Sequence, residues 1–221
     1  YYNIKSKRYM EEIKDAVVGG VKGILATMPV GSVVMSIAQE VQNGILQRRF
    51  EDWKEKVDEK LGNLEEEIRH KLPDNEIFAT VLLLSAQMAI KTNDEKRSYL
   101  ANAVKNAATT NISEDRIVVL LNCIDKYTLT HLKLLRFLKS PGEYKDQKSY
   151  YMTASTMGIF KDCYPKEDNL ILKVAITDMY SDGLINNNSL NTTQTIVGAF
   201  APQTTDLGND FIQFFGIDKI V

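Results

Sequence analysis

A regular apolar stripe in the first third of the chain constrains its fold more than any other feature. Apolar side chains recur there at steps of three and four residues, which keeps them on one face of an α-helix, while the positions between them are mostly charged. The stripe consists of Leu46, Phe50, Trp53, Val57, Leu61, Leu64, Ile68 and Leu72. It predicts one long amphipathic helix over residues 32–71, buried along one face and ended by Pro73.

Such a helix is too long for a compact chain of 221 residues. At ~1.5 Å per residue it would measure roughly 60 Å, against the ~30–40 Å diameter expected of a globule of this size. Where a helix projects, a second copy related by a two-fold axis is the commonest cover for its stripe. We therefore expect a homodimer whose interface contains Phe50, Trp53, Val57, Leu61, Leu64 and Ile68. The alternative is that residues 77–127 fold back and cover the stripe within one chain.

Further helices are expected over most of the chain, because it holds only five prolines and twelve glycines. Apolar spacing and capping residues predict helices over 7–27, 77–90, 94–108, 114–127, 131–139, 169–182 and 206–215, with a short one that ends at Tyr164-Pro165. The caps expected are Asp74, Asn93 or Thr92, Ser113, Thr153 or Ser155, Asp168 and Thr205. In the helix over 169–182 the apolar residues singled out are Leu170, Val174, Ile176 and Tyr180.

The composition excludes several classes of protein. The chain is 44% apolar and 25% charged, as globular proteins are, and its 27 basic against 29 acidic residues exclude a nucleic-acid coat held by bulk charge. Two cysteines and two histidines show no metal-ligand spacing, and no phosphate-binding glycine motif is present. We therefore expect no catalytic residue, metal or cofactor. No signal peptide is recognised in the given sequence, so a reduced, cytoplasmic chain is expected.

Two phrases in the second half resemble a known fold. Asp182-Gly183-Leu184-Ile185 looks like the junction between a third helix and a wing, and Thr205, Gly208 and Phe211 match the "T-x-x-G-x-x-F" phrase that follows the wing. Residues 128–221 thus resemble a winged-helix domain of the MarR/PadR-like kind. The resemblance implies a winged helix with a small β-wing over 128–221. With the helices expected before it, the chain is expected to be mainly α, with a helical bundle over 1–127. The Thr-rich stretch after Gly183, through Val197, is expected to be an extended arm.

In that family the third helix enters the DNA major groove and the wing touches phosphate. Here residues 168–182 hold one lysine, Lys173, against three aspartates, and residues 184–205 hold no Lys or Arg. Each phosphate contact needs a cation, so this pattern favours a winged helix that binds protein or is purely architectural. Nucleic acid would instead be contacted through one aromatic and basic cluster and Lys173; the cluster is Tyr144, Lys145, Lys148, Tyr150 and Tyr151. The same tyrosines can equally pack a loop over the domain.

Residues 16–39 form an apolar run in which Lys22 is the only charge, with a G-x-x-x-G spacing at Gly19 and Gly23. It is long enough to span a bilayer, although Pro29 interrupts it, and a buried hairpin is the favoured interpretation. The layout of the whole chain is also similar to uncharacterised bacterial abortive-infection proteins of the Abi-alpha type, which implies phage defence at the membrane. The function predicted is non-enzymatic binding or regulation, through helix-mediated association and a winged-helix protein-interaction module. A DNA-binding transcriptional regulator and the phage-defence protein are the alternatives.

Overall fold

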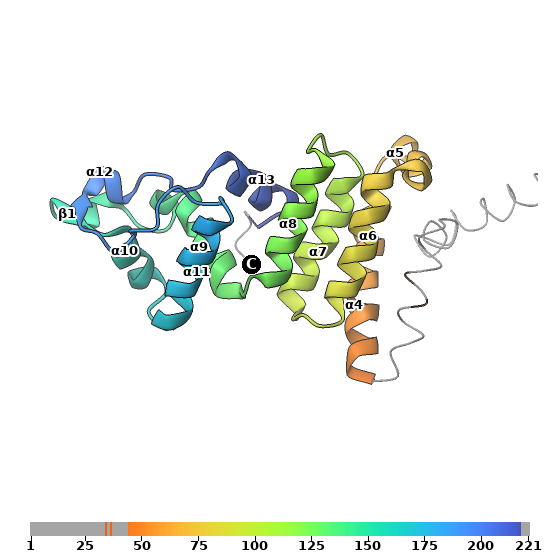
Figure 1. Cartoon of the computed structure of the whole chain (residues 1–221), viewed down its shortest axis with the longest axis horizontal. Helices are drawn as coiled ribbons and strands as arrows, with labels where there is room; N and C mark the ends of the chain where they lie inside the picture. The colour runs from red at the N-terminus through yellow and green to blue at the C-terminus, as the bar shows by residue number, and fades with distance from the viewer. Residues whose placement is uncertain (1–33, 35, 37–43, 218–221) are drawn as a thin grey trace, which may run out of the picture. The chain divides into compact units, whose positions relative to one another are not determined.

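The computed structural model describes residues 34, 36 and 44–217, and within them the protein is mainly helical, with one small sheet (Figure 1). The predicted helix over 7–27 lies outside the described residues, as does the apolar run 16–39 except at two positions. The chain divides into two compact units, Tyr1–Ile117 and Val118–Val221. The boundary expected from the sequence lies at 127/128, at the end of helix α8, whereas most of α8 groups with the second unit.

The described part of the first unit is a small helical bundle. Its elements are α4 (Gly44–Gly62), α5 (Glu66–Lys71), the 3-10 turn η1 (Leu72–Asp74), α6 (Glu76–Ala89), α7 (Asp94–Ala107) and the start of α8 (Glu114–Lys126). Helix α4 packs against α6 and α7, and these two pack against each other, so the three helices lie side by side (Figure 1). The charged flank of α4 is tied to α7 by two ion pairs, Arg97 with Asp52 at 2.5 Å and Lys56 with Asp94 at 3.0 Å.

The predicted long helix is wrong at its C-terminal end, because α4 ends at Gly62 and a new helix begins at Glu66. Between them Glu65 is extended, with φ −58° and ψ 144°. Glycine is a poor helix former, and the side-chain amide of Asn63 donates to the carbonyl of Glu59 at 2.9 Å, which satisfies one of the carbonyls that a helix end exposes. The local chemistry of Gly62-Asn63 therefore outweighs the apolar spacing that continues across it.

The second unit contains the rest of α8 and a mixed set of short elements. They are α9 (Leu129–Lys139), η2 (Pro141–Glu143), η3 (Gln147–Ser149), β1 (Thr153–Ala154), α10 (Thr156–Cys163), α11 (Asn169–Ser181), β2 (Gln194–Thr195), α12 (Ile196–Ala199) and α13 (Asp206–Phe215). Helix α9 packs against both α11 and α13. Strands β1 and β2 are antiparallel, with Thr153 opposite Thr195. The small sheet thus joins a segment before α10 to the segment after α11.

The segment after α11 departs from the predicted extended arm. It turns repeatedly, forms only two strand residues, and becomes helical at Ile196, because the Thr195 hydroxyl accepts from the amide of Gly198 and caps α12. The arm closes on itself near its base, where Ile185 and Thr204 form an isolated antiparallel bridge. Gly183, just after α11, has φ +77°, a left-handed conformation that glycine adopts without strain.

The phrase that begins at Thr205 closes the unit through three separate contacts. The Thr205 hydroxyl donates to the carbonyl of Gly183 at 2.6 Å and accepts from the amide of Gly208 at 3.0 Å, so it caps α13 as predicted. Gly208 lies so close to the preceding chain that a Cβ built on it would be 2.1 Å from the carbonyl oxygen of Leu184. Phe211, one turn later, is fully buried.

Most of the other predicted helix starts are confirmed. The side chains of Asn93, Ser155 and Asp168 each accept a backbone N–H in the first turn of their helix. One expected cap is wrong: Asn75, not Asp74, accepts from the amide of Phe78 and begins α6. Asp74 is the last residue of the 3-10 turn that contains Pro73, so the capping position falls one residue later, at Asn75.

Candidate protein-interaction surface

The predicted dimer interface on α4 is mostly covered within one chain. Phe50, Trp53, Val57 and Leu61 are at most 1% exposed, and α6 and α7 pack on the helix that carries them. Leu64 lies in the break after Gly62 and Ile68 lies on α5, where both are half-buried. The four core side chains are therefore not available to a partner while the bundle is folded. The homodimer itself stays a prediction.

Among the described helices, α11 carries more exposed large apolar side chains than any other. Leu170 is 70% exposed, Val174 50%, Tyr180 45% and Ile171 38%. At 100° per residue, Leu170 and Val174 are at the centre of one face, and Ile171 and Tyr180 flank it on opposite sides. The opposite face holds Leu172, Ala175, Ile176 and Met179, which are all buried. We call the exposed set, Leu170, Ile171, Val174 and Tyr180, the outer face of α11.

The negative charges of α11 are paired away from the centre of this outer face. Lys126 lies 2.5 Å from the carboxylate of Asp182 and 3.7 Å from that of Asp178. The Tyr127 hydroxyl donates to Asp182 at 2.7 Å. Both aspartates thus contact residues at the end of α8 or just after it. The excess of aspartate over lysine in residues 168–182 is therefore partly neutralised by Lys126 of a neighbouring segment.

His131 belongs to the same polar group and has a structural role there. Its Nδ1 accepts from the amide of Thr128 at 3.2 Å, which makes it the third residue of a capping box at the start of α9. With Nδ1 an acceptor, the neutral ring carries its proton on Nε2, which lies 3.4 Å from Asp178. The ring also stacks on Tyr127, with the centroids 4.8 Å apart. These contacts hold α11 to α9.

A shallow cleft of about 220 Å³ lies beside this group, lined by Val119, Asn122, Cys123, Lys126 and Asp182. Burial, with the Asp182 charge, raises the pKa of the Cys123 thiol, so the thiolate form is disfavoured. Burial and the bond to Asp182 raise the pKa of Tyr127 far above its usual range, so its hydroxyl remains a donor. The cleft therefore offers a protonated thiol and a lysine that is already paired. This chemistry suits a structural contact better than a nucleophile.

The predicted aromatic and basic cluster is divided between packed and exposed side chains. The ring of Tyr144 packs edge-on against Phe137, and burial raises its pKa to about 12. Tyr150 packs against Phe200 at 5.6 Å and donates to Asp162 at 2.6 Å.

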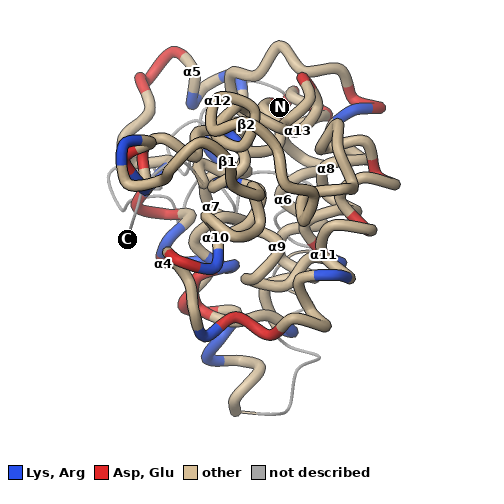
Figure 2. Tube along the Cα trace, turned by 90° about the vertical axis from the view of Figure 1, so that its left-hand side faces the viewer, with Lys and Arg blue, Asp and Glu red and all other residues tan. Residues whose placement is uncertain are grey.

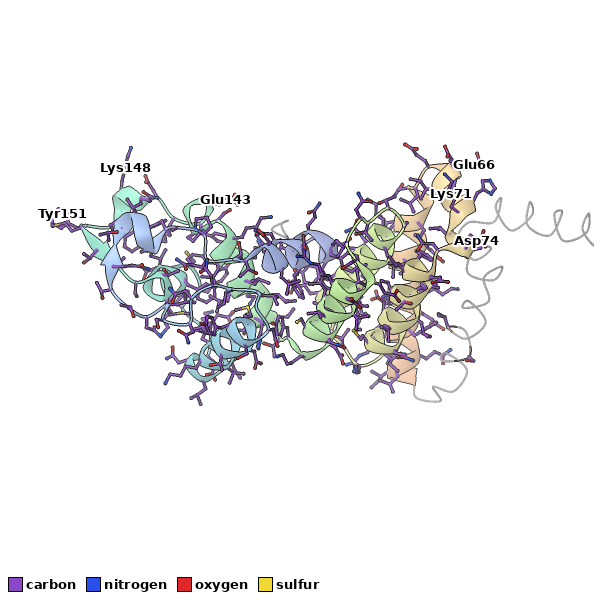
Figure 3. The ribbon with its side chains drawn as sticks, turned by 45° about the horizontal axis from the view of Figure 1, so that its top comes forward. Glu66, Lys71, Asp74, Glu143, Lys148 and Tyr151 are labelled. Carbon is purple, nitrogen blue, oxygen red and sulfur yellow. The ribbon has the colours of Figure 1, made fainter. Side chains whose placement is uncertain are left out.

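The remaining members of that cluster differ in exposure. Lys145 is half-buried, whereas Tyr151 and Lys148 are exposed and point away from the unit (Figure 3). Lys173 is exposed on α11, a different element. One exposed ring makes no platform for successive bases.

Two further findings bear on the kind of site. Among the described residues, no three His, Cys, Asp or Glu side chains are grouped so that they could hold a metal ion. Within the same part of the chain, no helix has both the length and the apolar character that crossing a bilayer requires.

Leu170, Val174 and Tyr180 are noted above as apolar, but the outer face that they form with Ile171 is not predicted, although a signal for it is present. Residues 170–180 include eight apolar side chains, which is more than one face of a helix can hold. Some of these eight side chains must therefore lie on a face of the helix that is turned away from the core of the unit. Comparison of the chain with protein-family models, with curated proteins and with solved structures gives no match. Function must therefore be argued from these surfaces.

Proposed function

We propose that the protein is a non-enzymatic binding module whose second unit docks another protein through the outer face of α11. The observation that carries this proposal is the exposure of Leu170, Ile171, Val174 and Tyr180 on a single helix. Apolar side chains that recur at helical spacing on an outer surface are how helices meet partner helices and apolar grooves. Their exposure has a free-energy cost in water that a partner would remove.

The order of elements in the second unit supports the winged-helix resemblance. Helix α9 is followed by β1, α10 and α11, and the segment after α11 folds back to Thr204 before α13 begins. In that resemblance α11 corresponds to the third helix, which in DNA-binding members contacts the major groove. We infer that here the same helix contacts protein.

The distribution of charge favours protein over DNA as the partner. Lys173 is the single cation on α11, and residues 183–205 contain no charged side chain of either sign. Phosphate contacts by lysine and arginine supply most of the sequence-independent affinity for duplex DNA. A helix that presents leucine, isoleucine, valine and one lysine has little to offer a phosphate backbone, but it suits an apolar partner surface with a carboxylate at its edge.

Site-specific photocrosslinking in the full chain tests this proposal. A photoreactive phenylalanine analogue would replace Leu170 in one variant and Val174 in a second, with Lys161 on α10 as the exposed control position. We expect one discrete adduct from positions 170 and 174 and none from position 161. The adduct should disappear when Tyr180→Asp is added, because the flank of the face is then charged.

The mass of the adduct identifies the partner. An adduct of twice the chain mass would mean that a second copy occupies the face, and another mass would mean a different protein. A fluorescence-anisotropy titration with duplex DNA at low salt tests the alternative, a DNA-binding regulator. Such a regulator should bind the duplex, and its affinity should fall steeply as salt is added. If no adduct forms and duplex DNA binds in this way, the protein-docking proposal is wrong.

A further inference from the structure

A second exposed apolar feature lies at the end of the second unit, away from the outer face of α11. Tyr151 is 89% exposed, Val197 75% and Met152 73%, which makes them the three most exposed large apolar side chains among the described residues. The pairing of β1 with β2 brings them together, because Thr153 lies opposite Thr195 and the amide of Ile196 donates to the carbonyl of Met152. We call Tyr151, Met152 and Val197 the apolar tip.

The tip is held in this exposed position by its own structure. Met152 has φ +59°, the left-handed conformation that residues with a Cβ rarely adopt. Tyr150, two residues earlier, is anchored by its ring contact with Phe200 and its hydrogen bond to Asp162. Side chains alternate along an extended chain, so Tyr151 faces away from this anchor, and the positive φ at Met152 interrupts the alternation, so that Met152 is exposed as well. Figure 3 shows Tyr151 pointing away from the ribbon at this end of the unit.

The two segments that form the tip carry little charge, and the nearest carboxylates in sequence, Asp146 and Asp162, flank them, with Asp162 bonded to Tyr150. Residues 147–160 contain one charged side chain, Lys148, and residues 183–205 contain none, although 25% of the whole chain is charged. In Figure 2 the trace through β1, β2 and α12 accordingly carries neither acidic nor basic colour. Lys148 is exposed and, like Tyr151, points outward (Figure 3). No carboxylate in these two segments would have to lose its water if the tip entered an apolar medium.

We propose that the apolar tip inserts into the interfacial layer of a lipid bilayer. Tyrosine is enriched at that layer because its ring is apolar and its hydroxyl remains wet, and a lysine beside it can keep its ammonium in water while its stem lies along the lipid. A projecting, charge-free tip fits a fluid surface, which can deform around it. A flat helical face such as that of α11 suits a protein partner better. Three side chains alone give weak and reversible attachment. This inference stands apart from the docking proposed for α11.

The depth of the tip can be measured with a single fluorophore. The chain contains one tryptophan, Trp53, which is fully buried in the first unit and gives a constant background. In the Tyr151→Trp variant, a new indole sits on the tip. We expect its emission to shift to shorter wavelength on phosphatidylcholine vesicles and to be quenched by lipids that carry a shallow nitroxide. The matched control is Leu170→Trp on α11, which should show neither change.

This readout is local, so attachment of the chain through any other segment does not mimic it. An indole at position 151 whose emission stays that of a water-exposed group, and which the nitroxide lipid fails to quench, would overturn the proposal. Equal quenching of the Tyr151→Trp and Leu170→Trp variants would overturn it as well. Failure here leaves the crosslinking result for α11 untouched, so the two proposals can fail separately.

Vesicle flotation provides the second measurement. The variant with Tyr151→Ser, Met152→Ser and Val197→Ser should float with vesicles at least about tenfold less than its matched control, since it lacks the apolar area of the tip. The control carries Leu170→Ser, Ile171→Ser and Val174→Ser and loses comparable area from α11. Far-ultraviolet circular dichroism would check that both variants are folded. Equal flotation of the two variants would contradict insertion by the tip.

Discussion

Helices α4 and α11 both carry apolar side chains at helical spacing, yet these side chains have opposite surroundings in the folded protein. On α4 the stripe through Trp53 and Val57 is covered by α6 and α7, and the remaining face is charged. On α11 one apolar face packs inside the unit while a second, through Leu170 and Val174, lies in water. Apolar spacing therefore identifies the side chains that share a face. It does not say whether the chain itself will cover them.

The charges beside each stripe explain part of this difference. Asp52 on α4 binds Lys56 on the same helix and Arg97 on α7, so its flank is attached to the helix that covers the stripe. Asp182, at the end of α11, binds Lys126 and Tyr127 on the inner side, so its attachment leaves the outer face open. These partly exposed ion pairs thus mark the side of each helix that is held by its own unit.

The largest difference between α4 and α11 is expected when an aspartate is placed on each apolar stripe. Val57→Asp would bury an unpaired carboxylate at a site that is fully covered, and we expect it to destabilise the first unit by more than about 4 kcal/mol or to prevent it from folding. Val174→Asp, the same substitution on the outer face of α11, should change stability by no more than about 0.5 kcal/mol. Urea unfolding followed by circular dichroism measures both. Equal effects would mean that the two faces are equally covered.

Shortening a leucine on each stripe should give a smaller but graded difference. Leu61→Ala removes buried methyl groups and leaves a cavity, so a loss of about 2–5 kcal/mol is expected. Leu170→Ala removes atoms that are already in water, and the unfolding midpoint should hardly move. Differential scanning calorimetry would report both variants. A loss of more than about 1 kcal/mol for Leu170→Ala would show that α11 is covered in solution.

The inner attachment of α11 can be weakened without touching its outer face. Tyr127→Phe keeps the buried ring but removes the hydroxyl that donates to Asp182, so a loss of about 1–2 kcal/mol is expected. Tyr180→Phe, on the outer flank of the same helix, should cost nothing measurable. Hydrogen exchange of the α11 amides would show faster opening in the first variant alone. Similar exchange in both would contradict the role assigned to Tyr127.

Low pH should reduce the stability of both units, and this is the smallest of the predicted effects. Burial alone would raise the pKa of Asp52, but hydrogen bonds from Lys56 and Arg97 outweigh it and leave that pKa below its ordinary value of 3.8. Burial opposes the bonds from Lys133 and Thr130 in the same way at Glu167, whose pKa lies below 4.5. A lowered carboxyl pKa adds stability that is fully present above the ordinary value.

This stability is lost as the pH falls from those values through the lowered ones. The urea midpoint should therefore stay level from pH 7 to about 5 and decline below about 4.5. Asp52→Asn should flatten the decline of the first unit and leave that of the second unchanged. A midpoint that rises on acidification would contradict the sign of both shifts.

Much of the local structure could be predicted from the sequence. Helices α6 to α9, α11 and α13 begin and end within two residues of the predicted spans, because caps such as Asn93, Asp168 and Thr205 act on neighbouring amides. The break at Gly62 was missed because a short competing contact, from Asn63 to Glu59, is invisible to apolar spacing. The pairing of β1 with β2 was missed because it joins segments about forty residues apart in sequence.

The candidate surfaces were harder to predict, for the same physical reason. Tyr144, Tyr150 and Tyr151 are similar in sequence context, but only the neighbours supplied by distant segments decide which ring is packed. The ring of Tyr144 packs against Phe137 and that of Tyr150 packs against Phe200, whereas Tyr151 is exposed to water. Exposure is a property of the whole unit, so it cannot be read from a stretch of ten residues.

The close approach at Gly208 has a consequence for finding relatives of this chain. Any side chain at this position would clash with the backbone of Leu184. A related protein with the same turn must therefore have glycine there, even where the rest of its sequence differs. Thr205 three residues before it and Phe211 three residues after it are fixed by a cap and by burial. This seven-residue signature is a search pattern in its own right. Its spacing can recognise a distant homologue when overall similarity has faded.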